Sequence, residues 1–493
     1  MAHRHLERLT SFDTSFLANE RANGHMAIGA VLMCEGEAPG HEEFIAHLRG
    51  RLHQVPRLRQ RLLQPPWRLG TPFWVDDPDF GLDRHVKRAT LGQPGDDERF
   101  AALVGELLAP PLERAKPLWE LVLVEGFADE RFAIVYRTHH AMADGISAVD
   151  IGMLLFDVEP ETGPSPAEAP WSPARTPSRW ALVRAAAAGL LAAPGRVATW
   201  LRRAREQPAR AARRAGDGIA GLWEVAWNLA RPAPAVPFNR PIGDRRGFAW
   251  ASHDLDDFKR IKNAFGGTVN DVSLAVVAGA LRRWLGEQGV RLDGLELKAL
   301  VPVSVRSEDE RGELGNKLTA MRGPLPVGIE DPVERLRSVS VAMDRLKASK
   351  QPYAAEAIWG VNDWWRDFAP QGLLRPTAAI NFSTRLFNLL VTNFPGPQVG
   401  FYVLGRPLAR IYPIGFLAKD HGLAIAILSY DGQVGFGLLA DPAAVPDADR
   451  LVDHLEAAVE ELRSAAQVAS PGDGDELAGD PRPGFARERE RLA

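Results

Sequence analysis

The sequence predicts a mixed α/β protein made of two halves joined by a helical bridge. Strand-like and helix-like segments alternate from the N-terminus to about residue 161, and the same mixture returns from residue 248 to about residue 465. Between them the composition changes to Pro, Ala and Arg. We therefore expect an N-terminal domain at 1–162, a bridge at 163–244, a second α/β domain at 245–466 and a disordered tail at 467–493.

The composition is that of an ordinary folded chain. Of 493 residues 45% are hydrophobic and 25% charged, which excludes a disordered or fibrous protein. The formal net charge of −4 favours no nucleic-acid partner, and no nucleic-acid-binding module is visible. Cys34 is the single cysteine, so no intrachain disulfide is possible, and the chain suits a reducing, cytoplasmic compartment. The N-terminus has no secretion signal, and apolar stretches such as 185–194 are too short to span a membrane.

In the first half, apolar spacing predicts a strand at 25–36 and amphipathic helices at 41–54 and 98–112. Residues 118–140 read as a β-hairpin that turns at 127–131. A further helix is expected to begin near Asp144.

The bridge opens with an extended linker at 163–177, followed by an Ala-rich helix that we expect Pro194 and Pro208 to break. In the second half the same reasoning predicts helices at 270–289 and 331–349 and strands at 295–306 and 421–441.

The end of the predicted hairpin carries the strongest chemical signal, a seven-residue HHxxxDG string from His139 to Gly145. Side chains alternate along a strand, so His139 and His140 should face opposite ways, with His140 on the face of Phe132 and Tyr136. We select His140 as the candidate base because it stands where the strand opens into a loop.

A neutral imidazole at this position suits acyl transfer. It can take a proton from an alcohol as the oxygen attacks a thioester, and then return it to the departing thiolate. Asp144 would cap the next helix, or pair with Arg306 or Arg137, and so orient the loop. Two plainer interpretations stay open: that the residues only close a strand and cap a helix, or that they bind a metal. Adjacent histidines that face apart chelate poorly, so we expect no metal site.

Several further strings, taken with HHxxxDG, resemble the bacterial wax ester synthase/diacylglycerol acyltransferase family. These are an opening LTSFDTSFLANE, Pro117-Leu118-Trp119 as its PLW motif, Asn270-Asp271 as its ND motif, VPVSVR at 301–306, GNKLTAMRGPLP at 315–326 and NFPGP at 393–397 where NVPGP is more usual. The resemblance runs in order from about Leu9 to Ala465, and the bridge shows no matching motif.

The resemblance implies two chloramphenicol-acetyltransferase-like domains forming a pseudo-dimer with an active-site tunnel between them. It implies transfer of a long-chain acyl group from acyl-CoA, as cosubstrate and without a further cofactor, to diacylglycerol or a long-chain alcohol. His140 would be the base, His139 its motif neighbour, Asp144 and Gly145 the structural end of the motif, and Asn270 with Asp271 the ND pair. The backbone N–H of Gly145 or the amide of Asn270 would serve as the oxyanion donor. For Pro117, Leu118 and Trp119, a core-packing role and a substrate contact are both open.

Such lipid substrates require a docking surface, and the bridge offers a basic one. Residues 171–215 hold ten arginines against one acidic residue, Glu206, interleaved with apolar residues. We therefore expect a cytoplasmic enzyme that binds peripherally to the inner face of the membrane or to lipid inclusions. A solvated helix packed on the domains is the alternative.

Other candidates carry weaker signals. Trp359, Trp364, Trp365 and Phe368 would line an acyl tunnel or belong to an ordinary core, and Arg375, Arg385 and Lys419 would meet CoA phosphates. No Gly-rich phosphate loop identifies those cations, so the CoA-binding residues are not assigned. Two other functions stay open: a condensation-type or polyketide-associated acyltransferase with a carrier-protein donor, and a non-catalytic protein that binds lipid droplets.

Overall fold

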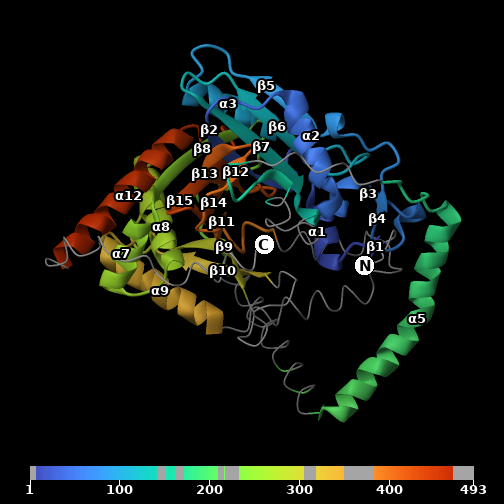
Figure 1. The fold of residues 1–493 in the computed structure, drawn as a ribbon. Helices are drawn as coiled ribbons and strands as arrows, with labels where there is room; N and C mark the ends of the chain where they lie inside the picture. The colour runs from blue at the N-terminus through green and yellow to red at the C-terminus, as the bar shows by residue number, and fades with distance from the viewer. Residues whose placement is uncertain are drawn as a thin grey trace.

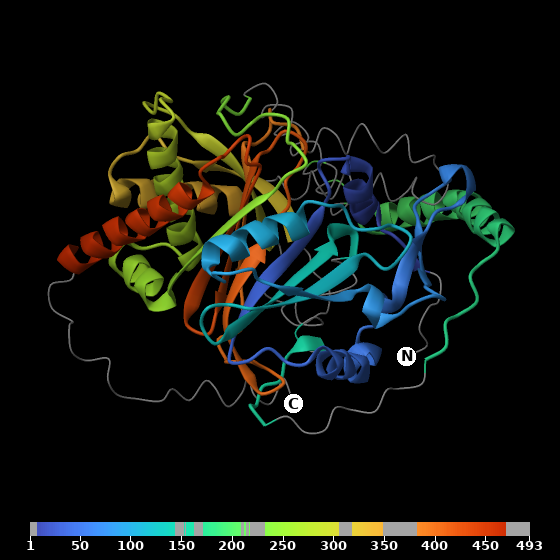
Figure 2. The same cartoon turned by 90° about the horizontal axis from the view of Figure 1, so that it is seen from above.

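Two six-stranded mixed sheets, each with helices packed against it, form the body of the protein (Figure 1). The computed structural model describes residues 7–142, 152, 154–161, 171–208, 212, 216, 232–304, 318–348 and 382–469. The predicted mixed α/β class is confirmed. Seen from above, the two halves lie side by side, with α12 (Ala448–Ala469) at one end and α5 (Arg179–Glu206) at the other (Figure 2).

The remaining described helices are α1 (Ser11–Asn19), α2 (His41–Arg51), α3 (Asp97–Leu108), α7 (Leu255–Phe265), α8 (Val269–Glu287) and α9 (Pro332–Ala348). The strands of the first half are β1 (Glu7–Arg8), β2 (Ala27–Glu35), β3 (Gln60–Leu63), β4 (Phe73–Asp76), β5 (Val86–Thr90), β6 (Trp119–Glu125) and β7 (Arg131–His139). Those of the second half are β8 (Gly247–Asp254), β9 (Leu297–Ser304), β10 (Leu318–Leu325), β11 (Leu389–Pro395), β12 (Tyr402–Val403), β13 (Arg406–Ile414), β14 (Leu423–Tyr430) and β15 (Gln433–Ala440).

Most elements expected from periodicity are present. The predicted helices correspond to α2, α3, α8 and α9, and the predicted hairpin to β6 and β7. The strand expected at 421–441 is instead the hairpin β14–β15. It turns at Asp431 and Gly432, which both have positive φ, as an Asp-Gly hairpin turn requires.

The first sheet contains strands from both halves of the chain. Its order is β12-β13-β2-β7-β6-β5, so β13 pairs antiparallel with β2 although nearly 400 positions separate them in sequence. The second sheet has the order β10-β9-β11-β14-β15-β8. The sequence division into 1–162 and 245–466 did not anticipate this exchange, because nothing local in 402–414 distinguishes a strand that pairs across halves.

Two glycines let the exchanged strand cross the second sheet closely. A Cβ on Gly437 would lie 1.9 Å from the carbonyl oxygen of Pro413, and one on Gly435 would lie 2.2 Å from that of Ile411. Only hydrogen fits in such gaps, so glycine is required where β15 passes β13. This backbone contact fixes how the two sheets meet.

A continuous apolar cluster also joins the halves. It combines Phe16, Val31 and Val135 of the first half with Leu390 and Phe416 of the second. Side chains along β7 point alternately to the two faces of the sheet. Val135 belongs to this cluster, whereas Phe132, Ile134 and Tyr136 belong to a separate cluster on the other face. The sheet is therefore buried on both faces.

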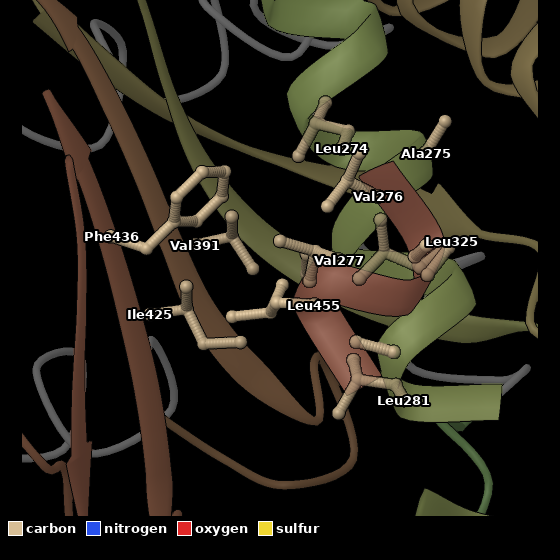
Figure 3. Packing of buried hydrophobic residues seen from close by; sticks show 14 of the residues in the cluster. Leu274, Ala275, Val276, Val277, Leu281, Leu325, Val391, Ile425, Phe436 and Leu455 are labelled. Carbon is tan, nitrogen blue, oxygen red and sulfur yellow. The ribbon is translucent and has the colours of Figure 1, made fainter. Parts of the chain in front are cut away.

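The core of the second half lies between its sheet and helices α8, α9 and α12 (Figure 3). Helix α8 is apolar around most of its circumference, and Val277 and Leu281 pack toward Leu455 of α12, while Val391, Ile425 and Phe436 come from the sheet. An all-round apolar helix belongs in a core.

Helix α5 corrects the expectation of a break at Pro194, because it is helical from Arg179 to Glu206. Proline at this position removes one backbone hydrogen bond, but its fixed φ is compatible with a helix, and the alanines around it are the strongest helix formers. The helix projects from the body, and near its start Leu182 packs on Phe73 and Val75 of the small sheet β1-β4-β3 (Figure 1).

Within the described residues, no single helix has the length and apolar character needed to cross a membrane. The bent pair α7 and α8 meets that test jointly, with an angle of 98° between the two helices.

Replacing Gly437 by alanine should loosen the joint between the sheets. The added methyl group collides with the Pro413 carbonyl, so we expect the free energy of unfolding to fall by about 1–3 kcal/mol in urea titrations. Gly247→Ala in neighbouring β8 is the control. Its Cβ would find its nearest neighbour at 3.8 Å, so its effect should stay within about 0.5 kcal/mol. Equal effects of the two variants would contradict the proposed role of the close approach.

Candidate active site

The two histidines of the HHxxxDG string stand where β7 ends. His139 is the last residue of the strand, and His140 begins a short 3-10 turn, η5 (His140–Met142). The expectation that His140 shares a face with Phe132 and Tyr136 is wrong, because strand alternation stops at His139 and the turn redirects the next side chain. His140 instead contacts Phe16 and Phe416, which belong to the cluster on the opposite face.

Aromatic rings from both halves enclose His140. The ring of Phe16 on α1 stacks on the imidazole at 3.9 Å between centroids and 14° between planes. Phe416 of the second half meets it edge-on at 5.6 Å, and Phe382 lies behind, 5.8 Å from Phe416. The candidate base therefore sits at the seam between the two halves.

Strand register explains why Phe416 reaches this point. Ile414 of β13 pairs with Gly29 of β2, which pairs in turn with Arg137 of β7. Ala27, two residues before Gly29, pairs with His139, and Phe416, two residues after the end of β13, meets the ring of His140. The exchanged strand thus brings part of the second half to the end of β7.

The imidazole of His140 is held in its neutral form. Burial lowers the pKa of His140 to about 4, and interaction with its own backbone opposes this shift only partly. Its Nδ1 is buried and has no hydrogen-bond partner among the residues that the structure describes, and its backbone N–H donates to the carbonyl of Met26 at 2.8 Å. A neutral imidazole is the form that can accept a proton.

His139 is fully buried and points elsewhere. Its Nδ1 accepts a hydrogen bond from the backbone N–H of Ala141 at 3.0 Å, which places the proton of the neutral ring on Nε2. That Nε2 lies 3.8 Å from the carboxylate of Glu20, which also forms an ion pair with Arg114. Burial, with smaller contributions from Arg114, His140 and His25, lowers the pKa of His139 to about 3. His139 therefore braces the turn that carries His140.

The PLW residues support the histidine strand from the core. The carbonyl of Leu118 accepts the backbone N–H of His139 at 2.9 Å, and Trp119 donates its indole N–H to the carbonyl of Leu58 at 2.8 Å. Trp119 also stacks on His85 at 4.6 Å, and Pro117 is buried beside it. Of the two interpretations left open by the sequence, this geometry favours packing.

The ND pair lies at the start of α8. Asp271 is buried and forms a capping box with Thr268, accepting the Thr268 N–H at 2.8 Å. Asn270 accepts a hydrogen bond from the amide of Asn393 at 3.2 Å, so the ND and NFPGP strings meet. Among the described contacts, no hydrogen bond or ring contact joins this pair to His140.

Several predicted residues lie outside the described part of the chain. These are Asp144, Gly145, Arg306, Trp359, Trp364, Trp365, Phe368 and Arg375. Arg385 and Lys419 are described, and both are exposed on the loops that carry Phe387 and Phe416. Within the described residues, no cluster of three His, Cys, Asp or Glu side chains is suited to hold a metal ion.

Sequence reasoning missed Phe16, Phe416, Glu20 and Arg114. Phe16 and Glu20 fall in the LTSFDTSFLANE string that supported the resemblance, so their position in that string was an available signal. Phe416 and Arg114 stand in segments with no motif, and only the strand register and the packing of the loop before β6 bring them to the histidines.

Comparison with known proteins fits this architecture. The first condensation domain of the calcium-dependent antibiotic synthetase has the same fold, with a TM-score of 0.55 at 18% identity over 94% of this chain and 97% of that one. The wax ester synthase/diacylglycerol acyltransferase from Marinobacter aquaeolei VT8 matches with a TM-score of 0.63 at 25% identity, over 93% and 99% of the two chains. The architecture is thus that of the two-domain, chloramphenicol-acetyltransferase-like class.

The family follows from sequence comparison. Residues 9–273 match the model of the wax ester synthase/diacylglycerol acyltransferase catalytic domain, and residues 314–463 match the WS/DGAT C-terminal domain. A Mycobacterium tuberculosis protein named "probable diacylglycerol O-acyltransferase tgs1" is 34% identical over 459 residues, covering 93% of this chain and 96% of that protein. The chain belongs to the wax ester synthase/diacylglycerol acyltransferase family, as its motifs predicted.

The buried histidines predict a pH-dependent stability. The folded-state pKa values of His25, His139 and His140 are about 4, 3 and 4, below the ordinary value of 6.5. Below pH 6.5 these histidines become protonated in the unfolded chain but stay neutral in the folded chain. The free energy of unfolding should therefore fall as the pH drops from about 6.5 toward 4. Urea titrations at a series of pH values measure this fall.

His25→Gln should make that decline shallower, whereas replacement of the exposed His53 by Gln should leave it unchanged. A free energy of unfolding that stays flat between pH 7 and pH 5 would show that the folded histidines titrate normally.

Glu20 should stabilise the turn through His139. Glu20→Ala removes the carboxylate near the buried Nε2 and the partner of Arg114, so we expect a loss of about 1–3 kcal/mol in the free energy of unfolding. Glu20→Gln keeps an acceptor oxygen and should lose less. Glu113→Ala, which removes an exposed carboxylate from the same loop as Arg114, is the control and should change stability by less than about 0.5 kcal/mol.

Proposed function

We propose that this chain transfers a long-chain acyl group from acyl-CoA to the hydroxyl of diacylglycerol or of a long-chain alcohol. The observation that carries the proposal is the neutral imidazole of His140, enclosed by aromatic rings at the seam of the two halves. Membership of the family and the names of its relatives support the same reaction.

In the proposed reaction His140 acts as a general base. Because Nδ1 is buried, Nε2 is the nitrogen placed to meet the acceptor hydroxyl. Nε2 takes the hydroxyl proton as the oxygen attacks the thioester carbonyl carbon, the carbon–sulfur bond then breaks, and the proton passes to the departing thiolate. The products are an ester and free CoA, and no covalent intermediate on the enzyme is required.

The surroundings of His140 suit an apolar substrate. Phe16, Phe382 and Phe416 form an aromatic wall from both halves, which favours acyl chains over water at the reacting atoms. We infer that the tunnel expected from the family opens along this seam. For Asp144 and Gly145 we propose the predicted roles of orienting the loop and permitting a tight turn. The Gly145 N–H or the amide of Asn270 is the proposed oxyanion donor.

We further propose that the protein works in the cytoplasm, peripherally bound to the inner membrane face or to lipid inclusions. The ten arginines of 171–215, with a single acidic residue among them, support this placement. A substrate with two or three long acyl chains is concentrated at such surfaces and is scarce in water.

The decisive experiment measures thiol release from palmitoyl-CoA with and without hexadecanol or dioleoylglycerol. Release should require an acceptor, and His140→Ala should lower its rate by about 10²–10⁴-fold because the general base is lost. His140→Gln tests the same loss with a bulkier side chain, and exposed His53→Ala is the matched control that should keep full activity.

Each competing function gives a different result in that assay. Activity only with a carrier-protein thioester would indicate a condensation-type enzyme, and lipid binding without turnover of any donor would indicate a non-catalytic protein. Full activity in His140→Ala would refute the assignment of the base.

A further inference from the structure

The first half presents two exposed tryptophans on adjoining elements. Trp67 lies in the short 3-10 turn η3 (Pro66–Arg68), which contacts helix α5, and Trp180 lies in the first turn of that helix. Each is 71% exposed. A single exposed apolar residue is ordinary. Two large exposed aromatic side chains on two elements that contact each other, η3 and α5, are typical of a binding surface.

The backbone at the exposed Trp67 is in a strained conformation. Trp67 and Arg68 have φ values of 52° and 54°, a left-handed conformation that bulky side chains rarely adopt. Pro65 and Pro66 precede them and restrict the chain's alternatives. The turn therefore adopts a strained backbone conformation that leaves the indole ring of Trp67 exposed to solvent. Burial of that ring against a partner would be favourable.

One face of α5 continues this surface. Leu182 marks the face that packs on the small sheet. The opposite face, reached at spacings of three and four residues, carries Trp180, Arg184, Ala187, Leu191, Arg202 and Arg205, all exposed. Leu191 is 80% exposed, and Glu206, paired with Arg202, is the acidic residue near the end of this stripe.

The helix is tied to the body only near its start in the described contacts. Leu182 and Ala185 pack against Phe73, Val75 and Leu63, and just before the helix Ala174 donates its N–H to Asp76 at 2.9 Å while Trp171 packs on Phe80. The small sheet β1-β4-β3 thus fixes the orientation of both helix α5 and η3 relative to the first half.

We infer that Trp67, Arg68 and the outward stripe of α5 form one docking surface for an anionic phospholipid bilayer. The tryptophans and Leu191 would insert among the headgroups and the upper acyl chains, and the arginines would meet lipid phosphates. Helix α5 would lie in the plane of the interface. The inference deepens the proposed peripheral association: it rests on that proposal and names the surface and the lipid.

Vesicle flotation of the full-length chain tests the inference. Wild type should float with vesicles of phosphatidylcholine mixed with phosphatidylglycerol, and at least tenfold less with phosphatidylcholine alone. Trp67→Ala and Trp180→Ala should each weaken binding to the anionic vesicles severalfold, and together at least tenfold. Arg184→Glu with Arg202→Glu should abolish the preference for the anionic lipid.

Matched controls lie on the far end of the molecule. Val468→Ala on α12 removes an apolar side chain that is 82% exposed, and Arg450→Glu reverses an exposed charge on the same helix. Both should bind as wild type does. Far-ultraviolet circular dichroism and urea titration confirm that each variant is folded.

Activity toward a short, water-soluble alcohol separates this inference from the proposed function. Docking variants should keep that activity and lose turnover of vesicle-borne dioleoylglycerol. If wild type turns over neither the soluble alcohol nor vesicle-borne dioleoylglycerol, the proposed function fails, whereas wild-type flotation by the double tryptophan variant overturns the docking surface. Self-association that depends on Trp67 and Trp180 would also overturn it, by assigning the surface to a second copy of the chain.

Discussion

The pairing of β13 with β2 is the interaction on which the rest of the structure depends. It commits a strand of the second half to the sheet of the first, and Gly435 and Gly437 allow the sheets to approach until backbone meets backbone. The relative position of the halves is then set by hydrogen bonds and by van der Waals contact, both of which depend steeply on distance. A seam built this way positions side chains more rigidly than a surface contact between domains would.

The two adjacent histidines illustrate how that rigidity is used. His139 accepts the Ala141 N–H at its Nδ1 and has its Nε2 3.8 Å from the Glu20 carboxylate, whereas the ring of His140 stacks on Phe16 and makes no hydrogen bond to another residue in the described part of the chain. Burial lowers the pKa of both rings, but only His140 lies among the aromatic rings of both halves, where we place the substrate. One imidazole therefore orients the backbone and the other is left for chemistry, a division that supporting residues commonly provide for a catalytic group.

Local patterns predicted the elements well and the joint between the halves poorly. Apolar runs bounded by turn residues located β6 and β7, and longer apolar segments located α8 and α9. The HHxxxDG string located the site because it is a short, contiguous motif. The neighbours of His140 were not predictable in the same way, since Phe416 arrives through a register between strands far apart in sequence. The face assigned to His140 failed because alternation holds only within a strand, and the break expected at Pro194 failed because its alanine neighbours sustain the helix.

The exchanged strand has a consequence for the order in which the protein is made. During synthesis β2 leaves the ribosome long before β13, so one edge of an apolar strand, AIGAVLMCE, stays unpaired while the intervening chain is translated. The first sheet therefore gains its last two strands only after nearly the whole polypeptide has been made. Nascent chains of this protein should depend on chaperone protection more than their ordinary composition suggests.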